Sequence, residues 1–232
     1  MIIRGKNVSK ETIRNTDKVK KVFMKRSFKD DIINDIKAKK IPYEFIDDNQ
    51  FENKYQNAQG IACLIDDYKY YELDECLTEV SNNSLVLILD SIEDPQNLGN
   101  IIRTFEILGG SFIIIPKNRS VDVTDTVMKV SCGAYNFVKI VKVTNLTQAI
   151  NKLKEKGFWV LAADMNGTEV YSEVRVDMPL AVIVGNEGFG ISKHVKENAD
   201  ILVRIPMEGK INSLNASISA AIILSNIKSR RK

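Results

Sequence analysis

Apolar runs of strand length alternate with helix-like stretches from residue 85 onward. The predicted strands are Leu85–Leu89, Phe112–Ile115, Phe137–Val143, Phe158–Ala163, Leu180–Val184 and Ile201–Val203. Apolar residues at helical spacing predict helices at Leu98–Leu108, Thr124–Cys132, Thr147–Lys156, Ile191–Asn198 and Ser213–Ser229. This alternation predicts an α/β fold with a parallel sheet covered by helices on both faces.

The first 70 residues contain shorter elements of the same two kinds. Helices are predicted at Val8–Asn15 and Phe28–Lys40, and strands at Lys21–Met24, Tyr43–Ile46 and Gly60–Ile65. These elements predict a small α/β domain. The segment that follows, Asp66–Ser84, is acidic and polar and ends in a turn sequence. We therefore expect a domain at 1–70, a linker at 71–84 and a second domain at 85–232.

Composition is that of an ordinary globular protein, with 232 residues of which 44% are hydrophobic. No apolar run approaches the about 20 residues that span a bilayer, and the first residues lack the apolar core of a signal peptide. The cysteines, Cys63, Cys76 and Cys132, form no zinc pattern and suggest reduced thiols. These features predict a cytoplasmic protein without a metal site.

Charge is segregated along the chain although the total is only +3. Residues 1–40 carry 13 Lys/Arg and 5 Asp/Glu, a net +8, whereas residues 41–80 carry 2 and 10, a net −8. A charge run is usually the solvated face of a surface helix. A basic face on a small domain is also how proteins attract the phosphate backbone of a nucleic acid. Both interpretations stay open.

Three polar loops rich in Gly and Asn follow predicted strands. They are Asp94–Thr104, Gly185–Gly190 and Ile205–Ser217. Ligands of open α/β sheets bind beyond the carboxyl ends of the strands, so three such loops predict one shared site. The glycines at 185, 188 and 190 do not have the spacing of a dinucleotide-binding turn, and a P-loop is absent. Nicotinamide chemistry and nucleotide-driven chemistry are therefore disfavoured.

The order and spacing of these loops resemble the SpoU/TrmH family of RNA 2′-O-ribose methyltransferases. The matching motif residues are Asn97, Gly99 and Arg103; Gly185, Glu187, Gly188 and Gly190; and Ile205, Pro206, Met207, Ser213, Leu214, Asn215 and Ser217. Residues 1–70 resemble the small substrate-binding domain of the RlmB-type subgroup. The resemblance implies a homodimer and a C-terminal trefoil knot, which pattern alone would have excluded because knots are nearly absent from proteins.

The resemblance also implies a cofactor and the residues that hold it. The cofactor is S-adenosylmethionine, and the implied binding residues are Gly185, Ile205, Met207 and Leu214. The alternative for Ile205 and Leu214 is plain core packing. The implied catalytic set is Asn97, Arg103, Glu187, Ser213 and Asn215.

Methyl transfer to a ribose hydroxyl needs a group that stabilises the alkoxide as it forms. Arg103 is the candidate for this role through a phosphate beside the target ribose. A general-base role is demanding for this side chain, because a guanidinium stays protonated in proteins. Asn97 either caps its helix or contacts the substrate. Glu187 either fixes a neighbouring loop or pairs with Arg103.

Two further positions are interpreted from local pattern. Ser213 is an acceptable N-cap for the last helix, which leaves Asn215 as an unusual residue in a helix interior and favours a site role for it. Phe189 departs from the basic or polar residue of many family members. It either stacks on a base or packs beneath its loop.

These observations predict S-adenosylmethionine-dependent 2′-O-methylation of a ribose, with a guanosine of 23S ribosomal RNA as the expected target. A tRNA target and a resistance-type ribosomal methyltransferase are alternatives, although tRNA enzymes of the family usually lack an N-terminal domain like residues 1–70. A protein of a different class, a non-catalytic RNA-binding or ribosome-assembly protein, is disfavoured by the intact motif residues.

Overall fold

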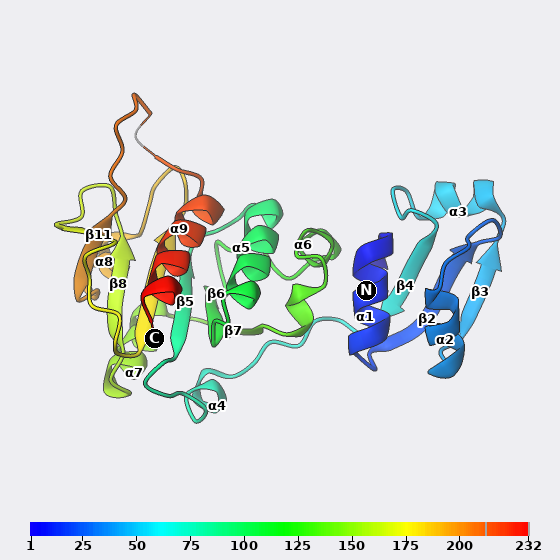
Figure 1. The fold of residues 1–232 in the computed structure, drawn as a ribbon, viewed down its shortest axis with the longest axis horizontal. Helices are drawn as coiled ribbons and strands as arrows, with labels where there is room; N and C mark the ends of the chain where they lie inside the picture. The colour runs from blue at the N-terminus through cyan, green and yellow to red at the C-terminus, as the bar shows by residue number, and fades with distance from the viewer. Residues whose placement is uncertain (212, 232) are drawn as a thin grey trace. The chain divides into compact units, whose positions relative to one another are not determined.

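The structure, a computed structural model, describes residues 1–211 and 213–231. The chain forms two compact units (Figure 1). The first consists of Met1–Lys69 together with Val123–Asn136, and the second of Tyr70–Asp122 together with Phe137–Lys232. The segment Val123–Asn136 was expected from the sequence to lie in the second domain, so the chain leaves the second unit once and returns to it.

The second unit is built on a seven-stranded sheet in which every paired strand is parallel to its neighbour. The strand order is β7-β6-β5-β10-β8-β11-β9. Their bounds are β5 (Leu85–Asp90), β6 (Phe112–Pro116), β7 (Lys139–Val143), β8 (Trp159–Ala163), β9 (Glu169–Val170), β10 (Leu180–Gly185) and β11 (Ile201–Arg204). The predicted α/β fold class with a parallel sheet is confirmed.

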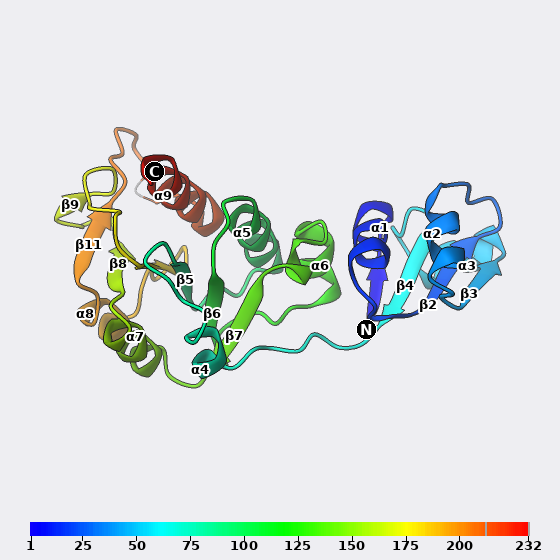
Figure 2. The same cartoon turned by 60° about the horizontal axis from the view of Figure 1, so that its bottom comes forward.

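Helices cover both faces of this sheet, as Figure 2 shows. Helices α5 (Pro95–Ile107) and α9 (Ala216–Arg230) lie together on one face, and α7 (Leu146–Glu155) and α8 (Lys193–Glu197) lie on the other. Because both faces are covered, the central strands read as continuous apolar runs, and all six residues of β5 are buried.

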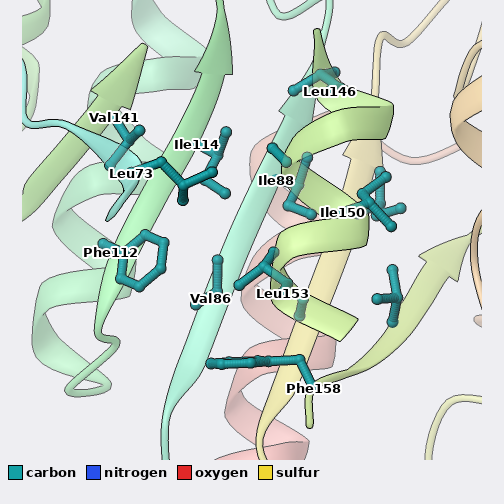
Figure 3. Close-up of a cluster of buried hydrophobic side chains, with 14 of the residues drawn as sticks. Leu73, Val86, Ile88, Phe112, Ile114, Val141, Leu146, Ile150, Leu153 and Phe158 are labelled. Atoms are coloured by element: carbon teal, nitrogen blue, oxygen red, sulfur yellow. The ribbon is translucent and has the colours of Figure 1, made fainter. Parts of the chain in front are cut away.

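Helix α7 illustrates how the core is made (Figure 3). Its buried residues Leu146, Ile150 and Leu153 recur at helical spacing and point toward the apolar side chains of the sheet. Val86 and Ile88 alternate along β5 and meet them from the sheet side. The side chains of α7, which recur at helical spacing, therefore pack against those of β5, which alternate as in a strand, in a single cluster.

The segment expected to be a linker takes part in this core. It contains the short helix α4 (Leu73–Cys76), and Leu73, Cys76 and Leu77 are buried in the same cluster as α7. Just before the helix, the backbone N–H of Tyr71 donates to the carbonyl of Ile140 at 2.9 Å. The polar composition of the segment hid a few apolar residues that face inward.

The first unit has a four-stranded sheet in the order β1-β4-β2-β3. Strand β2 pairs in parallel with β3 and antiparallel with β4. The elements are β1 (Ile2–Arg4), α1 (Lys6–Asn15), β2 (Val19–Lys25), α2 (Ile32–Ala38), β3 (Tyr43–Ile46), α3 (Asp48–Lys54), β4 (Ile61–Ile65), α6 (Asp125–Val130) and a 3-10 turn at Ala134–Asn136. The buried hydroxyls of Thr12 and Tyr135 share a hydrogen bond of 2.9 Å, which ties α1 to the segment after α6.

Helix α2 begins at Ile32, four residues later than predicted. Phe28 lies outside the helix and packs closely on Gly60, where a Cβ would approach its ring to 2.8 Å. Gly60 has a φ of +86°, so a side chain there is disfavoured by the backbone as well as by the ring.

Among the described residues, every helix is too short or too polar to cross a membrane. The same part of the chain shows no cluster of His, Cys, Asp and Glu with the arrangement of a metal site. Cys63 and Cys76 are free thiols, and burial raises the pKa of Cys63 to about 12.

Candidate active site

Three side chains from the three predicted loops meet in one hydrogen-bond network. Asn97 comes from α5, Glu187 from the loop after β10, and Asn215 from the start of α9. The amide of Asn215 donates to Asn97 Oδ1 at 2.8 Å, and the amide of Asn97 donates to Glu187 Oε1. Residues separated by about half the chain are therefore brought together, as the loop positions at the sheet edge predicted.

Glu187 is the acceptor at the centre of this network. Besides the amide of Asn97, its Oε1 lies 3.5 Å from the amide nitrogen of Asn215 and 3.4 Å from the backbone N–H of Ala216. A carboxylate that accepts from two other segments fixes their relative position, which was one of the two predicted roles of Glu187.

Asn97 is buried inside the first turn of α5 rather than at its end. The N-cap is Asp94, whose carboxylate accepts from the backbone N–H of Gln96 at 2.9 Å, and Pro95 occupies the first helical position. The suggestion that Asn97 caps the helix is therefore wrong. Its carbonyl oxygen is left for Asn215 and its amide for Glu187.

Asn215 is the N-cap of α9, which begins at Ala216. Its Oδ1 accepts from the backbone N–H of Ser217 at 2.9 Å and from the Ser217 hydroxyl at 2.6 Å. The sequence interpretation, with Ser213 as N-cap and Asn215 in the helix interior, is wrong. The oxygen of Asn215 caps the helix while its nitrogen donates to Asn97. One side chain therefore both stabilises the start of α9 and connects it to α5.

The loop after β10 is held in a tight conformation by its glycines. A Cβ on Gly185 would lie 2.3 Å from the backbone of Gly190, and Gly190 has a φ of +67°. Asn186 and Gly190 exchange backbone hydrogen bonds of 3.2 and 2.8 Å, and the Asn186 amide donates to the carbonyl of Ser91 at 3.0 Å. Glu187 is therefore carried on a fixed turn.

A pocket of about 480 Å³ lies beside the network. All four predicted cofactor-binding residues line it, namely Gly185, Ile205, Met207 and Leu214, and so do Glu187 and Ser213. Ile205 and Leu214 are half-buried and face the pocket, so plain core packing does not describe them. The volume falls within the range of small-molecule sites.

An ion pair that the sequence analysis missed also lines the pocket. Asp164 follows β8, and its carboxylate binds the ammonium of Lys196 on α8. Burial alone would raise the pKa of Asp164, but the hydrogen bonds from Lys196 and from the backbone of Asn166 outweigh it and hold the pKa below its usual range. Asp164 stands just beyond an apolar strand, and that position was the available clue.

Two predicted residues lie apart from the pocket floor. Arg103 is exposed on α5. It is absent from the described residues that line the pocket. Phe189 borders the pocket at the tip of the glycine loop, with 96% of its surface exposed. The alternative that Phe189 packs beneath its loop is therefore wrong.

The lining of the pocket suits a molecule with one flat apolar part and one charged part. Backbone groups of the glycine loop offer hydrogen bonds, the Ile205, Met207 and Leu214 side chains offer apolar surface, and the Asp164–Lys196 pair offers charge. S-adenosylmethionine combines an adenine with a charged amino-acid part, so the residues present fit it.

The fold and this site define a class of protein, the α/β methyltransferases whose cofactor pocket is built from C-terminal loops. Solved structures with this fold include the SpoU methyltransferase AviRb from Streptomyces viridochromogenes in complex with AdoMet, with a TM-score of 0.87 at 19% identity over 100% of this chain and 90% of that one. An AdoMet-bound rRNA methyltransferase from Sinorhizobium meliloti has a TM-score of 0.85 at 21% identity, over 100% and 87% of the two chains.

The chain belongs to the SpoU rRNA methylase family, whose sequence profile it matches over residues 84–225. Residues 2–71 match the profile described as RNA 2′-O ribose methyltransferase substrate binding. A Staphylococcus haemolyticus protein that carries the provisional name TrmH family tRNA/rRNA methyltransferase is 38% identical over 100% of this chain and 96% of its own length.

Family membership confirms the predicted class of enzyme. The protein is an S-adenosylmethionine-dependent RNA methyltransferase. The likeness to solved SpoU methyltransferases is also consistent with the C-terminal trefoil knot that the motif resemblance implied.

Proposed function

We propose that the protein methylates the 2′-hydroxyl of a guanosine ribose in 23S ribosomal RNA. The observation that carries the reaction type is the junction of Asn97, Glu187 and Asn215 beside the pocket lined by Gly185 and Leu214. In this proposal residues 85–232 bind the cofactor and perform the transfer, and residues 1–70 recognise the RNA. The match of residues 2–71 to a substrate-binding profile supports that division.

Gly185, Ile205, Met207 and Leu214 hold the cofactor in this proposal. S-adenosylmethionine, when bound, supplies a methyl group activated by a sulfonium. The apolar side chains would provide the surface for its adenine, and the backbone of the glycine loop would supply hydrogen bonds. The network of Asn97, Glu187 and Asn215 keeps the three loops in register, so that the reacting hydroxyl is met by a preorganised surface.

Arg103 stabilises the alkoxide that forms as the ribose hydroxyl loses its proton. Its planar guanidinium binds a phosphate next to the target ribose with two parallel hydrogen bonds. A guanidinium stays protonated at neutral pH, so the proton of the hydroxyl goes to another acceptor. In this proposal the acceptor is a phosphate oxygen of the RNA. Ser213, which lines the pocket, positions the substrate from the other side.

Phe189 offers a platform for the target base. Its ring is almost fully exposed beside the pocket, on a turn that the Asn186–Gly190 hydrogen bonds make rigid. Base stacking on an aromatic ring contributes roughly 1–3 kcal/mol per base. A flipped nucleoside that stacks on Phe189 would have its ribose next to the cofactor.

Homodimer formation is part of the same proposal. Ile107 on α5 and Ile218 on α9 are 70% and 50% exposed, although the two helices pack against each other. The family resemblance is the main ground for the homodimer, because single exposed isoleucines are common on protein surfaces. We also propose that the enzyme acts in the cytoplasm.

The identity of the methylated nucleotide tests the proposal. The protein is incubated with total RNA and methyl-labelled S-adenosylmethionine, and the modified position is mapped by primer extension at low nucleotide concentration. We expect one 2′-O-methylated guanosine in 23S ribosomal RNA. Label confined to tRNA would support the tRNA alternative, and binding to ribosomal RNA without any transfer would support the non-catalytic one.

A further inference from the structure

The strong positive charge of residues 1–40 is largely neutralised in the folded first unit. Seven of the 13 basic side chains in this stretch form ion pairs with acidic residues. The pairs are Lys6–Asp30, Lys10–Asp30, Lys10–Asp31, Arg14–Asp31, Arg14–Asp35, Lys20–Asp66, Lys21–Glu44, Lys25–Glu52 and Lys39–Asp17. Residues 1–69 carry 15 Lys/Arg and 11 Asp/Glu, a net charge of +4. Segregation along the sequence therefore does not by itself locate an RNA-binding face.

Positive charge remains at a few places only. Within residues 1–40, all of which the structure describes, Lys18, Arg26, Lys29, Lys37 and Lys40 are exposed and have no carboxylate within ion-pair distance. Two of them lie shortly before β3, Lys37 in the last turn of α2 and Lys40 in the connection that follows. This location matters because β3 itself carries exposed aromatic side chains.

Strand β3 is the edge of the four-stranded sheet, and its aromatic residues face outward in part. Tyr43 and Phe45 are 40% and 41% exposed, and their rings meet edge to face with centroids 5.8 Å apart. They alternate with Glu44, so both lie on one face of the strand while Glu44 lies on the other, where it pairs with Lys21. The face that carries the two rings therefore lacks the acidic residue of the strand.

A short connection, fixed by backbone hydrogen bonds, links the two lysines to the strand that carries the rings. The backbone N–H of Ile41 donates to the carbonyl of Ile36 at 3.0 Å, and that of Val22 donates to the carbonyl of Pro42 at 2.8 Å. Lys40 has a φ of +54°, which is the sharp turn that ends α2 and leads into β3.

The phase of α2 indicates where Lys37 points. Asp31 and Asp35 face α1, because both bind Arg14. Lys37 lies two residues, about 200°, further round the helix and so faces away from α1.

We propose that Tyr43, Phe45, Lys37 and Lys40, here called the β3-edge surface, bind an unpaired segment of the RNA substrate. Exposed rings stack on bases that are free of Watson–Crick pairing, and ammonium groups beside them bind the phosphates between those bases. The inference rests on the proposed function, since it names the surface through which the first unit recognises RNA. A strand face that carries two exposed rings and not Glu44, next to uncompensated lysines, complements a polyanion.

Two double variants and a matched control test the surface in the full-length protein. Tyr43→Leu with Phe45→Leu removes the aromatic rings and keeps apolar bulk. Lys37→Ala with Lys40→Ala removes the uncompensated charges. The control, Lys20→Ala with Lys25→Ala, makes the same change in net charge but takes lysines that are paired with Asp66 and Glu52. Fluorescence anisotropy measures binding of each protein to a labelled single-stranded RNA 12-mer and to its duplex across a salt series.

We expect the aromatic variant to bind the single strand about 5- to 100-fold more weakly with an unchanged salt slope, because stacking does not depend on counterions. The lysine variant should lower the salt slope by roughly 1.4, which is about 0.7 for each lost contact to a single strand. The control should change affinity and slope by less than half as much, and duplex binding should change little in the aromatic variant.

Equal losses in the lysine variant and the control would overturn the proposal, because general charge would then explain the affinity. Unchanged single-strand affinity in the aromatic variant would overturn it as well. A variant that changes its oligomeric state in solution but not its RNA affinity would also overturn the proposal, since this result would show that the edge contacts a second copy of the protein. Thermal unfolding of each variant excludes misfolding. Methyl transfer by the wild-type protein is measured separately, so failure of the proposed function is seen independently.

Discussion

At the residue scale, Asn215 shows what a motif can and cannot reveal. Its position in a motif that resembles the family's marked it as a site residue, and the structure places it in the network with Asn97 and Glu187. The reason given from sequence was nevertheless wrong, because Ser213 and Asn215 are both good N-caps and the sequence alone does not decide between them. The three-residue difference in the start of α9 follows from that ambiguity.

The two roles of Asn215 can be separated by substitution. Asn215→Ala removes both the cap and the bridge, and should lower the free energy of unfolding by about 0.5–2 kcal/mol as well as reduce methyl transfer. Asn215→Asp keeps a capping oxygen but replaces the donor to Asn97 with a second carboxylate beside Glu187. We expect it to lose most of the single-turnover rate, while the capping contribution to stability is kept and is partly offset by repulsion from Glu187. Wild-type turnover in Asn215→Asp would show that the bridge is dispensable.

The Asp164–Lys196 pair predicts a specific pH dependence. The folded pKa of Asp164 is held below its unfolded value of about 3.9. Its contribution to stability is therefore present above that value and is lost as pH falls through the folded pKa. Lys196→Met should lower stability at pH 7 and flatten the loss of stability below about pH 4, measured by urea unfolding. Parallel pH profiles of the two proteins would contradict this assignment.

At the element scale, the buried strands and the short strand β3 were predictable, whereas several other short elements were not. β5 and β10 are continuous apolar runs because helices cover both faces of their sheet, and their predicted bounds differ from the observed ones by a single residue. The elements β1, β9, α3 and α4 have two to seven residues, too few to establish a period. In α4 the few buried residues were masked by acidic neighbours.

The contribution of α4 leads to a prediction about fragments. Fragments 85–232 and 70–232 both contain every loop of the cofactor pocket, so both should bind S-adenosylmethionine if they fold. Fragment 85–232 lacks Leu73, Cys76 and Leu77, which fill part of the core around Val141. We expect it to unfold at a lower temperature or to aggregate, because burial of each such side chain contributes about 1.5–3 kcal/mol. Identical melting curves for the two fragments would contradict a structural role for this segment.

At the scale of the whole molecule, the charge pattern of the sequence did not reveal how the charges are paired in the fold. The basic start of the chain directed attention to residues 1–70, whereas the fold pairs many of those charges with acidic residues, among them Glu44, Glu52 and Asp66 from the acidic stretch. No periodicity reveals how a chain is threaded, so the knot came from family resemblance alone. Likewise, the position of Asp164 after a strand was visible in the sequence, but its contact with Lys196 was not, because that contact depends on the packing of distant elements.

The central claim is that Arg103 stabilises the reacting hydroxyl of an RNA ribose next to the cofactor pocket. Single-turnover methylation with saturating S-adenosylmethionine and ribosomal RNA tests it most directly. Arg103→Ala should lose about 2.7–4 kcal/mol of barrier stabilisation, roughly 10²–10³ in rate, with cofactor affinity nearly unchanged. Arg103→Lys should also be poorly active, since Lys lacks the planar fork that binds a phosphate. Near-normal turnover in Arg103→Ala would contradict the account and leave Ser213 and Asn215 as the leading candidates.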